Sequence, residues 1–115
     1  MNDGLGGARG SSQAMGDRGL YVGLIRLHVL HHAAAAPVYG GWIIEELRRH
    51  GYRLSPGTLY PMLHGLERKG YLKSRQESSG KRARRFYRIT PKGRDVLLDA
   101  KEKVKELFGE LFEEH

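Results

Sequence analysis

The spacing of apolar residues along the chain predicts three helices, two short strands and a final long helix. The first predicted helix, residues 20–36 (LYVGLIRLHVLHHAAAA), is apolar on most sides and consists mainly of helix-forming residues. Pro37 sets its end, because the residue before a proline avoids the helical conformation. A helix that is apolar on several sides must be buried against more than one neighbour.

A second helix is predicted between residues 38 and 51, where Ile43, Ile44 and Leu47 share one helical face. Its acidic residues come early and its arginines late, as the helix dipole favours. Gly51 follows the last turn, a position where helices commonly end on a glycine. The segment is therefore a short and well-delimited helix.

Residues 55–72 (SPGTLYPMLHGLERKGYL) contain a predicted third helix, which Gly70 ends and which has two prolines and two internal glycines. One face is apolar and comprises Leu59, Met62, Leu63 and Leu66. The opposite face comprises Gly57, Tyr60, Pro61, His64 and Arg68, with Thr58 and Glu67 at the edges. The poor helix formers thus gather on the face that points away from the core.

The start of this third helix has two interpretations. In the first, Ser55 is the N-cap and Pro56 occupies the first helical position, where a missing N–H costs nothing. In the second, residues 55–57 form a turn and Thr58 is the N-cap, which makes Pro61 a first-turn residue.

The segments YLKSRQ and ARRFYRI predict a two-stranded hairpin, joined by ESSGKR as the turn. Strand alternation places Tyr87 and Ile89 inward, and Arg84, Phe86 and Arg88 on the other side. A final helix follows, with Thr90 as its N-cap and Pro91 at its first position. Its apolar residues form a heptad seam that runs toward the C-terminus.

Charge is distributed unevenly along the chain. The net charge is +7 at pH 7, which favours an anionic partner, nucleic acid first. From Arg68 to Arg94 there are eleven lysines and arginines and the single acid Glu77, whereas the last helix is acidic. The chain has no cysteine, which excludes disulfides, thiol nucleophiles and thiolate zinc sites.

The chain length and the absence of long apolar segments limit the size of the folded body and the cellular location that we expect. Residues 1–19 are rich in glycine, lack apolar periodicity and are expected to form a disordered tail. They contain no signal-peptide core, and no segment approaches the roughly 20 apolar residues of a membrane span. We therefore expect a cytoplasmic protein with no membrane partner. About 96 residues remain for a folded body, a size at which dimerisation often adds stability.

The order of three helices, a hairpin and a long helix predicts a mainly α fold with a small β-hairpin. This is the winged helix-turn-helix arrangement, in which the third helix enters the DNA major groove. The predicted domains are a tail at 1–19, a DNA-binding domain at 20–89 and a dimerisation helix at 90–115.

Three motifs in the chain resemble motifs of the PadR family of bacterial transcriptional regulators. They are YGGWIIEELRRHGY, then SPGTLYPMLHGLERKGYL, and finally RFYRITPKG, so that the resemblance runs from about Leu20 to the end of the chain. It implies a homodimeric DNA-binding repressor paired through its last helix, in the subgroup with one short C-terminal helix. Some members of that subgroup bind aromatic compounds with a tryptophan in the last helix, whereas the only tryptophan here is Trp42.

Candidate site residues fall into three groups. The recognition-helix candidates are Ser55, Thr58, Tyr60, Pro61, His64 and Arg68. The wing candidates are Lys81, Arg82, Arg84 and Arg85. The dimer-interface candidates are Leu97, Ala100, Val104, Leu107, Phe108 and Leu111. We expect double-stranded DNA and a second copy of the chain as partners, with a small apolar or aromatic effector, and no cofactor.

Other interpretations of the same residues remain open. His28, His31 and His32 have helical spacing that can hold a metal, but without cysteine or a nearby carboxylate they are interpreted as structural. No set of Ser, His and Asp, pair of acids or phosphate loop indicates an enzyme. The alternative functions are a winged helix that binds another protein, and a nucleic-acid binder without sequence preference.

Overall fold

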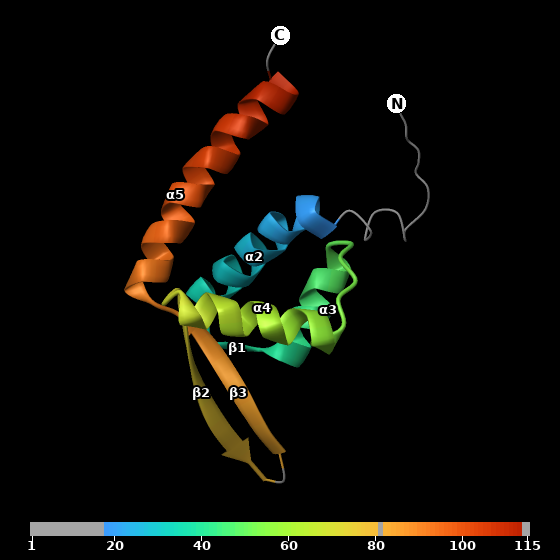
Figure 1. The fold of residues 1–115 in the computed structure, drawn as a ribbon, viewed down its shortest axis with the longest axis vertical. Helices are drawn as coiled ribbons and strands as arrows, with labels where there is room; N and C mark the ends of the chain where they lie inside the picture. The colour runs from blue at the N-terminus through green and yellow to red at the C-terminus, as the bar shows by residue number, and fades with distance from the viewer. Residues whose placement is uncertain (1–17, 81, 114–115) are drawn as a thin grey trace.

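The computed structural model describes residues 18–80 and 82–113. Its elements are α2(Arg18–Ala35), β1(Val38–Tyr39), α3(Gly40–Arg49), α4(Pro56–Arg68), β2(Leu72–Ser79), β3(Arg82–Ile89), α5(Pro91–Phe108) and the π-helical turn η2(Gly109–Glu113). This order confirms the predicted fold class. The hairpin of β2 and β3 extends from one side of the helices and α5 extends from the other (Figure 1). Residues 1–17 of the predicted tail lie outside the described residues.

The core forms where α2, α3 and α4 meet the base of the hairpin and the first turns of α5. Its fully buried side chains are Tyr87, Ile25, Ile43, Leu47, Leu59, Leu63, Leu72 and Val29. The four apolar positions predicted for the third helix are all buried, as are the two inward positions predicted for the second strand. Among the described residues, no helix has both the length and the apolar character needed to cross a membrane.

The sheet has three strands, whereas the sequence predicted two. The added strand β1 pairs antiparallel with β3, with Val38 opposite Tyr87 and Tyr39 opposite Phe86. The strand order is therefore β1-β3-β2. Two residues are too short to show the alternation that predicts a strand, so β1 could be found only through its pairing with β3.

The hairpin strands are longer than predicted, and the turn is correspondingly tighter. Ladder pairing continues to Ser79 opposite Arg82, so that Glu77 and Ser78 belong to β2 and not to the turn. Gly80 has a φ of 62°, the left-handed conformation that tight hairpin turns require and glycine adopts most readily.

The N-terminus of α5 is tied to the base of the hairpin. The Thr90 hydroxyl accepts a hydrogen bond from the Gly93 N–H at 2.9 Å, which confirms the predicted N-cap. The same hydroxyl donates to the carbonyl of Gly70 at 2.5 Å. A Cβ atom at Gly93 would lie 2.2 Å from the carbonyl oxygen of Tyr71, so that α5 and the hairpin meet at a distance only glycine allows.

We expect Gly93→Ala to destabilise the protein by about 1–3 kcal/mol, because the new methyl group meets backbone that cannot move aside. Gly23→Ala is the matched control, since no atom lies within 4 Å of a Cβ built there and α2 gains a better helix former. Urea unfolding followed by circular dichroism measures both variants. Equal stability of the two would contradict the close approach at Gly93.

Candidate nucleic-acid interface

Helix α4 presents one apolar and one polar face, as the sequence predicted. Tyr60, Pro61, His64 and Arg68 are exposed, while the leucines behind them are buried. Thr58 and Glu67 are partly buried and lie at the edges. The leucine face fixes α4 to the core, which leaves the other face available to a partner.

The first turn of α4 begins at Ser55. This residue is the N-cap, with Pro56 at the first helical position, so that the alternative with Thr58 as N-cap is wrong. The backbone N–H groups of Thr58 and Leu59 both donate to the Ser55 carbonyl at 3.0 Å. The Ser55 hydroxyl donates to the Thr58 hydroxyl at 3.3 Å and caps no backbone N–H.

Pro61 lies inside α4, where its missing N–H removes one helical hydrogen bond. The carbonyl left without this donor belongs to Gly57, four residues earlier. Both residues are exposed, so that water or a bound partner can satisfy this carbonyl. The proline therefore costs little at this position, and it leaves a hydrogen-bond acceptor on the outer face.

Tyr60 is held by the start of α3. Its side chain is 37% exposed, and a Cβ built at Gly40 would lie 2.2 Å from the Tyr60 hydroxyl oxygen. Gly40 thus provides the space into which the tyrosine ring packs. The ring is half-covered, and its hydroxyl lies beside the first residue of α3.

A hydrogen-bond network joins α4 to the wing. The Glu67 carboxylate accepts hydrogen bonds from the backbone N–H of Ser74 at 3.1 Å and from its hydroxyl at 2.9 and 3.0 Å. Arg85 donates to the same hydroxyl at 3.1 Å and to the Gln76 amide oxygen at 3.0 Å. Glu67, at the edge of the polar face of α4, thus joins the helix to the wing through Ser74.

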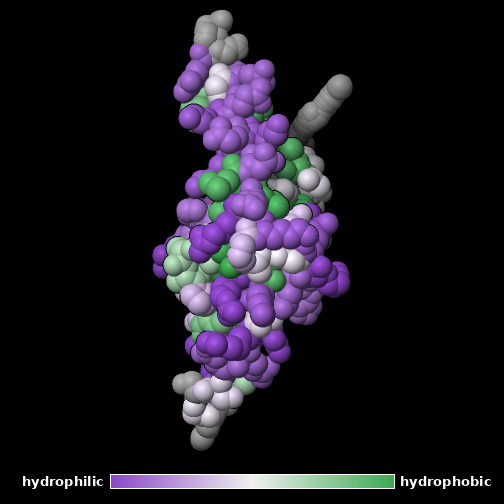
Figure 2. All heavy atoms as spheres, turned by 90° about the vertical axis from the view of Figure 1, so that its left-hand side faces the viewer, coloured by the Kyte–Doolittle hydropathy of each residue, from purple (hydrophilic) through white to green (hydrophobic). Residues whose placement is uncertain are grey.

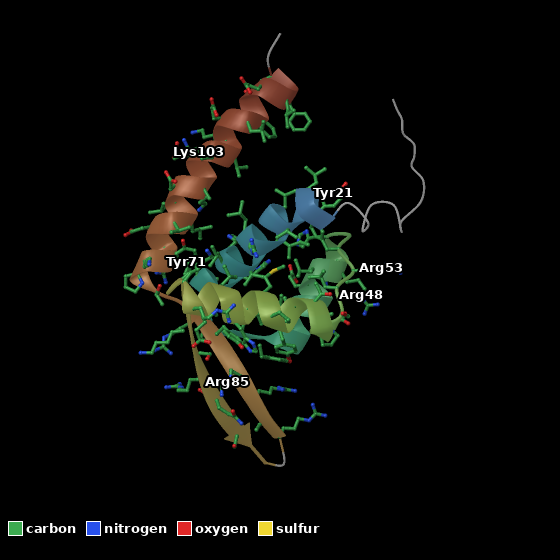
Figure 3. The ribbon with its side chains drawn as sticks, in the orientation of Figure 1. Tyr21, Arg48, Arg53, Tyr71, Arg85 and Lys103 are labelled. Carbon is green, nitrogen blue, oxygen red and sulfur yellow. The ribbon has the colours of Figure 1, made fainter. Side chains whose placement is uncertain are left out.

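The described wing arginines lie on both faces of the hairpin. Arg85 shares a face with the buried Tyr87, toward α4, whereas Arg82 and Arg84 alternate to the outer face. All three are exposed, and Figure 3 shows Arg85 on the hairpin below α4. Lys81, the fourth candidate, lies outside the described residues.

Tyr39 supports the outer face of the wing, a role that the sequence did not indicate. The Arg84 guanidinium carbon lies 4.3 Å from the centre of the Tyr39 ring, and the Phe86 ring lies 5.4 Å from it, edge-on. Such stacking restrains an arginine while leaving its N–H groups free to donate. This role depends on the pairing of β1 with β3, which places Tyr39 beside Phe86.

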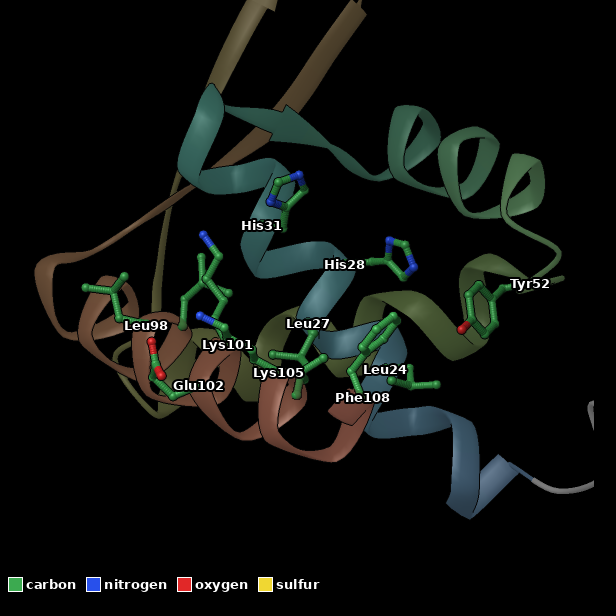
Figure 4. A pocket seen from close by; sticks show the side chains of 12 residues that line it. Leu24, Leu27, His28, His31, Tyr52, Leu98, Lys101, Glu102, Lys105 and Phe108 are labelled. Atoms are coloured by element: carbon green, nitrogen blue, oxygen red, sulfur yellow. The ribbon is translucent and has the colours of Figure 1, made fainter. Parts of the chain in front are cut away.

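A long apolar groove runs between α2 and α5. It has a volume of about 700 Å³, and its apolar lining includes Leu24, Leu27, Leu98, Val104 and Phe108 (Figure 4). The opposite side of α5 is mostly hydrophilic (Figure 2). A single chain leaves this apolar surface exposed, which is typical of an interaction site.

The interface candidates on α5 differ in burial. Val104, Leu107, Phe108 and Leu111 are all large and exposed. Leu97 is 8% exposed and packs in the core of its own chain, and Ala100 is intermediate. The exposed candidates therefore begin at Val104, past the body of the domain.

Comparisons with known proteins agree on one family. The model of the transcriptional regulator PadR-like family matches residues 29–99. Transcriptional regulator Rv3488 of Mycobacterium tuberculosis is 54% identical over 87 residues, which cover 76% of this chain and 81% of that protein. These names indicate a transcriptional regulator.

Solved structures show the same fold. A PadR-like transcription factor from Bacteroides fragilis superposes with a TM-score of 0.72 and 26% identity, covering 83% of this chain and 93% of that one. A PadR family regulator from Eggerthella lenta gives a TM-score of 0.68 and 27% identity, covering 92% and 100%. The chain belongs to the PadR-like family of transcriptional regulators.

Proposed function

We propose that this regulator is a homodimeric repressor that binds a palindromic operator through α4 and the wing. The observation that carries the proposal is the exposed polar face of α4 beside a basic hairpin, joined by the network of Glu67, Ser74 and Arg85. In this arrangement α4 occupies the major groove and the wing follows the DNA backbone or minor groove. A bound dimer would cover the operator and block transcription.

The exposed face of α4 has the chemistry for reading DNA. Gly57 and Thr58 are small, so that the first turn can approach the DNA closely, and Ser55 provides a hydroxyl beside it. Tyr60 is suited to a phosphate oxygen, while His64 and Arg68 can reach a base edge or a phosphate. Phosphate contacts from the wing arginines would set the register of α4 on the duplex.

The groove between α2 and α5 supports a role in dimerisation. Leu20 and Leu24 on α2 are exposed, as are the apolar residues on the outer half of α5. A second copy of the chain offers a matching apolar surface, and a two-fold pair would present two α4 helices to two half-sites.

A small apolar or aromatic effector fits the same region. The groove volume lies within the range of small-molecule sites, and Phe108 lies 4.9 Å from Phe112 between ring centres. A ligand bound there would change the spacing of the two α4 helices and so release the operator. The tryptophan that some relatives use has no counterpart in α5, so the phenylalanines would provide the aromatic contact.

Selection of bound duplexes from a random pool tests the proposal. We expect enrichment of a near-palindrome whose half-sites lie about 34 Å, or a multiple of this, apart. Tight binding without an enriched motif would indicate a nucleic-acid binder without sequence preference. No binding to any duplex would favour a winged helix that recognises another protein, and either result would contradict the repressor function.

A further inference from the structure

Three histidines converge where α2 packs against the end of α3. His28 and His32 lie four residues apart on α2, and His50 is the C-cap of α3. Their candidate ligand nitrogens all lie within 4.8 Å of one another. His31, which the sequence grouped with the first two, is exposed and points elsewhere (Figure 4).

The same place holds a carboxylate. The Oε2 atom of Glu46 lies 3.2 Å from Nε2 of His50 and 3.7 Å from Nε2 of His32. Metal–ligand bonds of about 2.0–2.1 Å in a tetrahedral site place neighbouring ligand atoms roughly 3.3 Å apart. The spacing about Glu46 is already close to this, and small side-chain rotations would bring the remaining nitrogens together.

One ring nitrogen in the cluster lacks a hydrogen-bond partner among the described residues. Nε2 of His32 is buried, and the Glu46 carboxylate is too far from it for a hydrogen bond. A buried polar atom without a partner is rare in folded proteins, and a missing ion is one of its ordinary explanations. This nitrogen points to a ligand at the site.

Neighbouring side chains orient the candidate ligands. Arg49 lies 3.7 Å from the Oε1 atom of Glu46, which leaves Oε2 to face the histidines. The Trp42 ring packs edge-on against His32 at 5.3 Å between centres, and Tyr52 packs against His28 at 5.5 Å. Such outer contacts restrict ring rotation, as they do around established metal sites.

We propose that His28, His32, His50 and Glu46 form a binding site for a divalent transition-metal ion of the zinc class. Three imidazole nitrogens and one carboxylate oxygen suit Zn²⁺ and also accept Co²⁺, whereas the absence of cysteine disfavours softer ions. The bound ion would tie α2 to the end of α3, next to the short link that leads into α4. The sequence interpretation treated the α2 histidines as structural, because His50 and Glu46 come close to them only in the folded chain.

Calorimetric titration with ZnCl₂ tests the site, using the full chain after removal of metal by a chelator. We expect one Zn²⁺ per chain with micromolar or tighter affinity. His32→Ala and His50→Ala should each weaken binding by at least about 100-fold, the upper end of outer-shell effects. His31→Ala is the matched control, because it removes an exposed imidazole from the same helix.

Co²⁺ provides a second readout through Trp42, the only tryptophan in the chain. Bound Co²⁺ should quench its fluorescence in the wild type and in His31→Ala, but not in His50→Ala, whose exposed position preserves the fold. Absence of Zn²⁺ binding at micromolar concentration, or equal affinity in wild type and His50→Ala, would overturn the site. No DNA is present in these measurements, so their failure leaves the repressor proposal unaffected.

Discussion

We expect Leu107→Glu combined with Leu111→Glu to convert the regulator into a monomer and to lower its operator affinity at least about 1000-fold. The two side chains are 49% and 62% exposed in a single chain, on the apolar seam that continues from α5 into η2. Burying four carboxylates at a two-fold interface would leave charges without partners, which costs several kcal/mol. A monomer can hold only one half-site, so its affinity approaches the nonspecific range.

Sedimentation velocity and operator titration measure this variant together. The wild type should sediment at twice the 13.0 kDa of one chain, and the variant at the mass of one chain. Glu106→Ala with Glu110→Ala is the control, because it changes exposed polar residues next to the apolar positions of α5 and η2 and should leave the dimer intact. A variant that remained dimeric would place the interface elsewhere.

The second large effect is expected at the wing, where Arg82→Ala with Arg84→Ala should weaken operator binding and reduce its salt dependence. If four cations per subunit neutralise phosphates, a wild-type dimer makes about eight contacts, and log affinity falls with log salt at a slope near −7. The double variant removes four of these contacts from the dimer. The slope should therefore flatten to roughly −4, and most of the affinity should be lost at low salt.

Fluorescence anisotropy of a labelled operator at several salt concentrations measures the slope. The control is Lys103→Glu on α5, which changes the net charge of each chain by the same two units far from the wing (Figure 3). If both variants had the wild-type slope, the described arginines of the outer face would make no phosphate contacts. If both flattened equally, the effect would come from net charge and not from the wing.

Local sequence signals were sufficient for the helices and the main strands. The buried faces of α4 and β3 followed directly from periodicity, because side-chain direction repeats every 3.6 residues in a helix and every two in a strand. The N-cap at Thr90 followed from residue type beside a proline, whereas the choice of Ser55 over Thr58 needed the structure. These features depend on neighbours within one turn, which the sequence shows.

The errors arose where the partner lies far along the chain. Strand β1 exists because Val38 meets Tyr87, a residue of a distant strand. Likewise, Tyr39 contacts Arg84 only because β1 pairs with β3. No periodic spacing in the sequence predicts either of these contacts.

The sequence by itself determined the family, the order of the helices and the hairpin, and the polar face of α4, since all of these follow from residue type and local spacing. The tertiary structure alone decided that Tyr39 packs against Arg84 and which part of α5 stays exposed. It also decided that His50 and Glu46, and not His31, join His28 and His32. The physical reason is that packing of α2 against α3 and α5 sets these distances, and no local periodicity encodes how two helices meet.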